Sequence, residues 1–272
     1  KPFPFEREPT SHGVIIASDR ARHLAFTIRW TGFEPGAVAE LGSLAIDRAT
    51  SADEFRAALE RWTLPAATFV YATRDGRIGT RPAGAVPVRR GWNGALPAPG
   101  WTGEYEWERV SQEADRPLPR EPAPGYVASA NDSVARTRRI NDVLSAQPSF
   151  GIDDFKQLQH DTLAWNAARL VPLLAPLKSD RADVEEARAR LLTWDLRLAA
   201  ASADATLYVL WENALLRRLA HGKIERSLAD DFAARRKDVL VPALTRPSSA
   251  WFAGSPARAR DGLMLAALAD AV

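Results

Sequence analysis

Short runs of strand-forming residues, bounded by turn residues, occur in the first half of the chain. Residues 69–73 form one such run, and residues 77–80 form the run that returns after the Arg-Asp-Gly turn at residues 74–76. An Asp-Gly pair between two such runs is typical of a β-hairpin. We therefore expect residues 69–80 to form a hairpin.

Two further strands are predicted downstream of this hairpin. Val86 and Val88 share one face of the first of them, and a loop rich in Pro, Gly and Trp follows. Residues 125–130 read as the second, which ends at Asn131. A connector rich in proline precedes it at residues 117–125, and we expect that connector to be extended.

One helix is predicted within this strand-rich half, at residues 51–62. Ser51 and Glu54 have the spacing of a capping box, in which each residue pairs with the other's backbone amide. Phe55, Leu59 and Trp62 then recur at helical spacing and form one apolar face. We interpret this segment as a packing helix.

The second half of the chain has helical periodicity almost throughout. Ser133 or Thr137 is expected to begin its first helix, and Pro172 to stop or kink its second. The predicted helices cover residues 133–145, 151–170, 180–194, 203–220, 228–240 and 257–272. The apolar stripe of residues 203–220 is interpreted as core packing; it consists of Leu207, Leu210, Trp211, Ala214, Leu215 and Leu219. Strands followed by helices predict the α+β class, with a strand-rich domain at residues 1–132 and a helical subdomain at residues 133–272.

Composition excludes several functional classes. The formal net charge of the 272 residues is only +2, and the arginines are dispersed, so no nucleic-acid partner is expected. No apolar run reaches the ~20 residues that a membrane span requires. The chain has no Cys, which removes disulfides, thiolate nucleophiles and Cys-based zinc sites. It begins at Lys1, and we expect it to be a piece of a larger processed protein.

The usual hydrolase motifs do not occur in the sequence. It contains no G-x-S-x-G, no H-E-x-x-H and no P-loop, and none of its histidines has another within one helical turn. His160 and Asp161 could form an orienting pair within a helix, although a surface histidine is the simpler interpretation. Asp153 and Asp154 suit the beginning of a helix better than acid–base chemistry.

Several segments, taken in order, resemble the β-chain of the penicillin amidase family of N-terminal-nucleophile hydrolases. They are LAFTIRWTGFEPG (24–36), SADEFRAALERW (51–62), FVYATRDGRIGTR (69–81), VPVRRGWNGALPAPGWTGEYEW (86–107), GYVASAND (125–132) and LLTWD (191–195). The resemblance implies that the first half forms part of a four-layer αββα sandwich and that the second half is a helical insertion. His12-Gly13 matches a His-Gly pair at the start of a strand, where its role is structural.

The resemblance also implies a mechanism. An N-terminal Ser attacks an amide carbonyl with its own α-amino group as base, and donors stabilise the oxyanion that results. Asn131 matches the family's oxyanion-hole Asn, and Arg136 matches the Arg that holds its surroundings. Ala67 and Ser43 match positions in the acyl pocket.

The sequence departs from the family pattern at several positions, and these departures limit which residue roles the resemblance implies. Lys1 cannot be the nucleophile, which is expected upstream, so the isolated chain is expected to be inactive. The chain crosses from Asn131 to Arg136 without the family's longer loop, which brings a calcium ligand. Gly94 matches a second calcium-ligand position, and calcium binding stays an open alternative for the full-length protein. Ser43 replaces a Trp, which puts benzyl penicillin in doubt as a substrate.

The expected partners are the α-chain and the N-terminal part of the β-chain from the same precursor, together with a small-molecule amide. The substrates considered are acylated amines, β-lactam side chains and acyl-homoserine lactones, and the family implies a periplasmic or secreted protein. Two alternatives stay open. One is a non-catalytic binding or assembly domain derived from the family, and the other is a helical scaffold that binds peptides.

Overall fold

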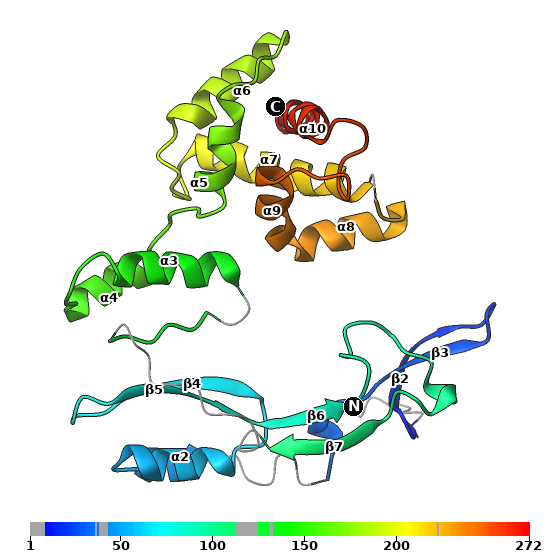
Figure 1. The fold of residues 1–272 in the computed structure, drawn as a ribbon, viewed down its shortest axis with the longest axis vertical. Coiled ribbons are helices and arrows are strands. Elements are labelled where there is room, and N and C mark those ends of the chain that lie inside the picture. The colour runs from blue at the N-terminus through cyan, green and yellow to red at the C-terminus, as the bar shows by residue number, and fades with distance from the viewer. Residues whose placement is uncertain (1–8, 36, 38–42, 113–124, 131–132, 222) are drawn as a thin grey trace, which may run out of the picture. The chain divides into compact units, whose positions relative to one another are not determined.

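The computed structural model describes residues 9–35, 37, 43–112, 125–130, 133–221 and 223–272. The chain divides into two compact units, one up to Ser129 and one from Ala130 onward. The first contains the strands and the second contains helices (Figure 1). The α+β class is therefore confirmed. The assignment of residues 1–132 and 133–272 to a hydrolase core and a helical subdomain stays a prediction.

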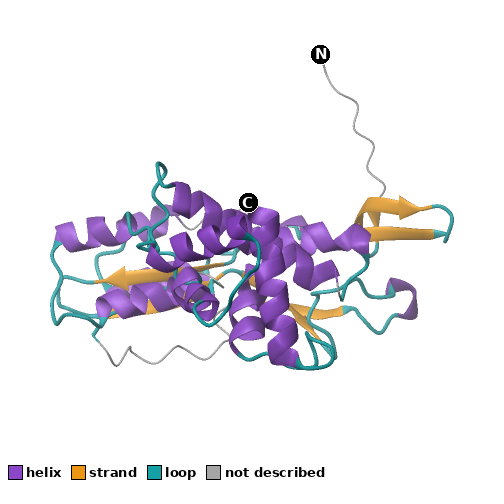
Figure 2. Cartoon of the chain, turned by 90° about the horizontal axis from the view of Figure 1, so that it is seen from above, coloured by secondary structure: helices purple, strands orange, loops and turns teal. Residues whose placement is uncertain are grey.

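The strands of the first unit form short antiparallel groups and no continuous sheet within its described residues (Figure 2). The three groups are β1-β2-β3, β4-β5 and β6-β7. Their bounds are β1 (Pro9–Thr10), β2 (Gly13–Asp19), β3 (Leu24–Ile28), β4 (Ala67–Ala72), β5 (Ile78–Ala83), β6 (Ala85–Arg89) and β7 (Trp107–Gln112). A bulge between Ile15 and Ala17 interrupts the pairing of β2 with β3.

The β4-β5 pair is the hairpin that the sequence predicts. Tyr71 pairs with Gly79, and the turn closes where the amide of Thr73 donates to the carbonyl of Arg77 over 2.9 Å. Gly76 takes a φ of +87°, which glycine adopts without strain. The sequence thus located this hairpin correctly.

The helix predicted at residues 51–62 is α2 (Ala52–Glu60). The amide of Glu54 donates to the Ser51 hydroxyl over 3.2 Å, which confirms the predicted N-cap. Figure 1 shows α2 alongside the β4-β5 hairpin, where Phe55 packs against Tyr71 and Trp62 packs against Phe69. These contacts confirm α2 as a packing helix.

A second helix in this unit, α1 (Ser43–Arg48), was not predicted. It has only six residues, which is too short for an apolar period to be recognised in the sequence. It packs against α2.

The second unit is helical. Its α-helices are α3 (Val134–Leu144), α4 (Ile152–Gln159), α5 (Ala167–Leu170), α6 (Ala182–Thr193), α7 (Ala203–His221), α8 (Arg226–Arg235), α9 (Leu240–Thr245) and α10 (Pro256–Ala271). Short 3₁₀ turns at Val171–Leu174 and Lys237–Val239 precede α6 and α9. Ser133 caps α3, as one of the two predicted residues.

The core of this unit forms around α7, which packs against α6, α8 and α10. Trp211 and Leu215 are fully buried, and the indole nitrogen of Trp211 donates to the carbonyl of Met264 on α10 over 3.1 Å. The predicted core stripe is confirmed except at Leu210, whose side chain is 46% exposed. Within the described helices, none is long and apolar enough to cross a bilayer.

The helix predicted at residues 151–170 is wrong, because α4 ends at Gln159 and α5 begins only at Ala167. The intervening backbone finds partners elsewhere. The amide of Ala164 donates to the carbonyl of Leu196, and the amide of Leu198 donates to the carbonyl of Thr162, each over 2.9 Å. Because these groups pair with a distant segment, the helical ladder cannot continue through them.

The helix predicted at residues 228–240 is also wrong in its bounds. It is replaced by α8, a 3₁₀ turn and α9. Pro242 stands in the first turn of α9, where a missing amide hydrogen costs nothing.

The connector predicted at residues 117–125 falls outside the described residues apart from Gly125.

Candidate functional site

Arg136 lies in the first turn of α3, close to the predicted oxyanion residue in the sequence. Its backbone amide donates to the Ser133 hydroxyl over 3.4 Å, which caps the helix. Its guanidinium reaches back, and Nη2 donates to the carbonyl of Ala130 over 3.3 Å. Ala130 directly precedes Asn131, which lies outside the described residues. Arg136 therefore ties the beginning of α3 to the residue before Asn131.

The segment at residues 125–130 is not the strand that the sequence predicted. Only Ala130 has a strand-like bridge, and residues 126–129 have no regular structure. A strand requires a hydrogen-bonded neighbour, and no described ladder pairs with these residues. The carbonyl of Ala130, at the end of this segment, accepts from the guanidinium of Arg136 and from the backbone amide of Ser133, each over 3.3 Å.

The two predicted acyl-pocket residues lie in the first unit. Ala67 begins β4, pairs with Ala83, and stands at the end of the face that carries Phe69 and Tyr71. Ser43 is the first residue of α1. Both side chains are exposed. The structure gives no contact between the two, and their role in a pocket stays a prediction.

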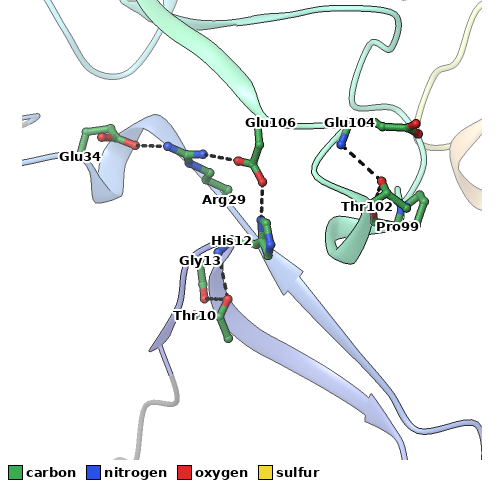
Figure 3. A network of polar contacts seen from close by, with 9 residues as sticks. All are labelled: Thr10, His12, Gly13, Arg29, Glu34, Pro99, Thr102, Glu104 and Glu106. Atoms are coloured by element: carbon green, nitrogen blue, oxygen red, sulfur yellow. Dashed lines mark hydrogen bonds and ion pairs between the residues drawn. The ribbon is translucent and has the colours of Figure 1, made fainter.

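The His12-Gly13 pair belongs to a polar network that connects β2 and β3 with the segment before β7 (Figure 3). Glu106 lies between His12 and Arg29, with its oxygens 3.2 Å from His12 Nδ1 and 3.3 Å from Arg29 Nη1. The guanidinium of Arg29 also lies 4.4 Å from the centre of the Trp107 ring. These contacts suit the structural role expected for His12.

His160 and Asp161 do not form the pair within a helix that the sequence suggested. His160 is the exposed C-cap of α4. Asp161 instead accepts from Arg139 on α3, with 2.5 Å between Oδ2 and Nη2, and its Oδ1 accepts from the amide of Leu163 over 2.8 Å. The hydrogen bond from Arg139 holds the pKa of Asp161 below its usual range.

A buried carboxylate on α7, that of Glu212, was missed by the sequence analysis. Its Oε1 accepts from the hydroxyl of Tyr208 over 2.8 Å and from the amide of Asn166 over 3.1 Å, and its Oε2 lies 2.8 Å from Lys237 Nζ. Burial and the neighbouring carboxylate raise the pKa of Tyr208, so its hydroxyl remains a donor. The predicted core stripe of residues 203–220 did not include Glu212, and two of its partners, Asn166 and Lys237, are distant in sequence.

The described residues do not fit a calcium site at Gly94. The guanidinium carbon of Arg89 lies 2.9 Å from the point where a Cβ on Gly94 would stand, which puts a positive charge beside this backbone. No group of three or more His, Cys, Asp or Glu side chains in the described residues is arranged to hold a metal ion.

The loop at residues 91–99 and Tyr105 line an open depression of about 520 Å³. Trp92 and Tyr105 meet edge to face in its wall, with ring centres 5.8 Å apart. Neither Ser43 nor Ala67 lines this depression, so it is not the predicted acyl pocket.

Comparison with known proteins connects these features to a family. Residues 2–272 match the family model described as penicillin amidase. The chain is 30% identical over 270 residues to the penicillin acylase 2 proenzyme of Pseudomonas sp. (strain SE83), covering 92% of this chain and 34% of that protein. It is 32% identical over 167 residues to the acyl-homoserine lactone acylase QuiP of Pseudomonas fluorescens, covering 49% of this chain and 20% of that protein. The chain thus spans about a third or less of the length of these two relatives.

A solved structure has the same fold. It is a thermostable penicillin G acylase from Alcaligenes faecalis, with a TM-score of 0.78 and 18% sequence identity over 97% of this chain and 56% of that chain. At this identity the likeness establishes the fold alone. The family match covers nearly every residue, and it confirms the resemblance drawn from the ordered sequence segments. The chain belongs to the penicillin amidase family.

Proposed function

We propose that this chain forms part of an N-terminal-nucleophile amidohydrolase that cleaves linear amides, and that it contributes Asn131 to the oxyanion hole. Membership of the penicillin amidase family supports the reaction class. The contact from Arg136 to the carbonyl of Ala130 supports the location of the site, because it fixes the residue next to Asn131. The alternative of a non-catalytic domain is an outcome of the test below.

In the proposed reaction the nucleophilic Ser belongs to another part of the precursor. Its hydroxyl oxygen bonds to the amide carbon, and its α-amino group takes the hydroxyl proton. The negative oxygen of the tetrahedral intermediate accepts from the side-chain amide of Asn131 and from backbone N–H groups. When the C–N bond breaks, the proton passes to the leaving amine, and water then hydrolyses the acyl ester.

Arg136 is a positioning residue in this proposal. Its guanidinium donates to Ala130 and does not need to touch the substrate. An oxyanion donor stabilises the transition state only if it is already aimed where the charge develops. By holding the Ala130 carbonyl, Arg136 restrains the backbone that carries the Asn131 side chain.

Asn131→Ala in the full-length, processed protein tests the proposal. Loss of an oxyanion-hole donor typically lowers kcat by about 10²–10³-fold. KM should change little, because the donor acts on the transition state and not on the bound substrate. Asn93→Ala is the matched control, because Asn93 lies in an exposed loop and its side chain accepts, among the described residues, from the amide of Ala95. Wild-type kcat in Asn131→Ala, with normal processing and stability, would sink the assignment and favour a non-catalytic domain.

We propose that the acyl pocket includes Ser43 and Ala67 and accepts acyl groups other than phenylacetyl. The small side chains at both positions leave room, and relatives carry the names of penicillin and acyl-homoserine lactone acylases. In the full-length enzyme, Ser43→Trp should lower kcat/KM for a long acyl amide by about tenfold more than for a short one, because the indole fills the space. Equal effects on the two substrates would contradict this pocket.

The proposal implies a precursor that is cut into chains which stay associated, and a periplasmic or secreted location. Family membership supports both proposals, which concern the larger protein. Cell fractionation with an antibody against this chain tests the location, and recovery of the protein in the cytoplasm alone would contradict it.

A further inference from the structure

The helix that carries Arg136 lies outside the main apolar cluster of the second unit. The large apolar cluster of this unit begins at Ala164 and includes no residue of α3 (Val134–Leu144). The described contacts of α3 with the segment after α4 come from charged side chains. Arg139 binds Asp161, and the Arg138 guanidinium lies 5.6 Å from the centre of the Trp165 ring. Apolar packing alone therefore does not fix the orientation of α3.

The Arg139–Asp161 pair is the stronger of these contacts. The two side chains are only 26% and 15% exposed, so solvent screens their attraction less than in a surface pair. Arg139 Nε is also buried and has no hydrogen-bond partner within the described part of the chain. Removal of Asp161 would leave a poorly paired cation, whereas the contact of Arg138 with Trp165 can supply only a small attraction.

Asp161 is itself firmly attached to the helical core. Its second oxygen accepts from the amide of Leu163, and the next residue, Ala164, is buried in the apolar cluster. Ala164 in turn donates its amide to the carbonyl of Leu196. The carboxylate thus presents a fixed acceptor to α3.

Arg139 follows Arg136 by three residues, which places both on the same side of α3. A rotation of α3 that released Arg139 from Asp161 would therefore also move Arg136 and its contact with Ala130. We propose that Asp161 is a positioning residue of the hydrolytic site, which acts through Arg139 and α3 on Arg136. This inference rests on the proposed function.

The test uses the full-length, processed enzyme with one amide substrate. Asp161→Ala should lower kcat by about tenfold with KM within about twofold, because a displaced donor loses transition-state contacts before it loses substrate binding. Asp161→Asn should fall between wild type and Asp161→Ala, since it keeps one acceptor oxygen, which can replace one of the two bonds to Leu163 and Arg139. It also keeps the test decisive if the alanine variant does not fold. Asp153→Ala is the matched control, because Asp153 forms an exposed pair with Lys156 on α4, and it should leave kcat unchanged.

A double variant separates a positioning role from simple destabilisation. Asp161→Ala combined with Arg136→Ala should have the kcat of Arg136→Ala alone, if Asp161 acts only through Arg136. Losses that multiply would overturn the inference, and so would wild-type kcat in both Asp161 variants. If these results occurred while Asn131→Ala lost activity, the proposed function would stand without this inference. If Asn131→Ala kept wild-type kcat, the proposed function itself would fail, and this inference with it.

Discussion

At the scale of single residues, the side chains with the clearest structural roles are charged groups that bind backbone carbonyls or other charges. Arg136 reaches the Ala130 carbonyl, and Arg188, whose side chain is 8% exposed, reaches the carbonyl of Leu174 and the carboxylate of Glu185. Such charge-assisted hydrogen bonds hold backbone carbonyls in place. The carbonyl partners lie six and fourteen residues away from these arginines, so no local motif predicts them.

The Glu185–Arg188 pair predicts a pH dependence of stability. The hydrogen bond from Arg188 lowers the pKa of Glu185 from 4.5 to about 2. A carboxylate whose pKa is lower in the folded state than in the unfolded state stabilises the folded protein at pH values above its unfolded pKa. That stabilisation is lost as the pH falls toward its folded pKa. The wild-type unfolding midpoint should therefore fall more steeply between pH 4.5 and about 2 than that of Glu185→Gln. Parallel curves for the two proteins in urea unfolding would contradict this role.

At the scale of elements, the sequence predicts where helices occur better than where they end. Periodicity located the capped helices α2 and α3, because their N-caps and apolar faces are local signals. It ran α4 and α5 together, because the residues that break them apart pair with backbone near Leu196. The same break places Asp161 beside Arg139, and no pattern within residues 151–170 could reveal it.

The buried Glu212 joins three elements and gives a prediction at this scale. Its side chain accepts from Tyr208 and Asn166 and pairs with Lys237. Glu212→Ala should lower the free energy of unfolding by about 3–5 kcal/mol, because it leaves a buried hydroxyl and amide unpaired and removes the partner of Lys237. Tyr208→Phe, which removes one donor only, should cost about 1.5–3 kcal/mol. Chemical denaturation measures both, and a smaller loss in Glu212→Ala than in Tyr208→Phe would contradict the account.

At the scale of the whole molecule, the order of the segments carried more information than any one motif. Strands followed by helices were sufficient for the α+β class, and the ordered segments were sufficient for the family. The site was less predictable. Asn131 and Arg136 were chosen by resemblance, and only the coordinates supply the contact between Arg136 and Ala130. The acyl-pocket role proposed for Ser43 and Ala67 depends on substrate contacts that no sequence pattern within this chain encodes.

The central claim is that Arg136 serves catalysis by holding the segment that carries Asn131. A double-mutant cycle on kcat in the full-length, processed enzyme tests it most directly. Arg136→Ala alone should lower kcat by about 10²-fold, as expected when a catalytic group is displaced. Combined with Asn131→Ala, it should cost nothing further, because the group it positions is already gone. Losses that multiply in the double variant, or wild-type kcat in Arg136→Ala, would contradict the account.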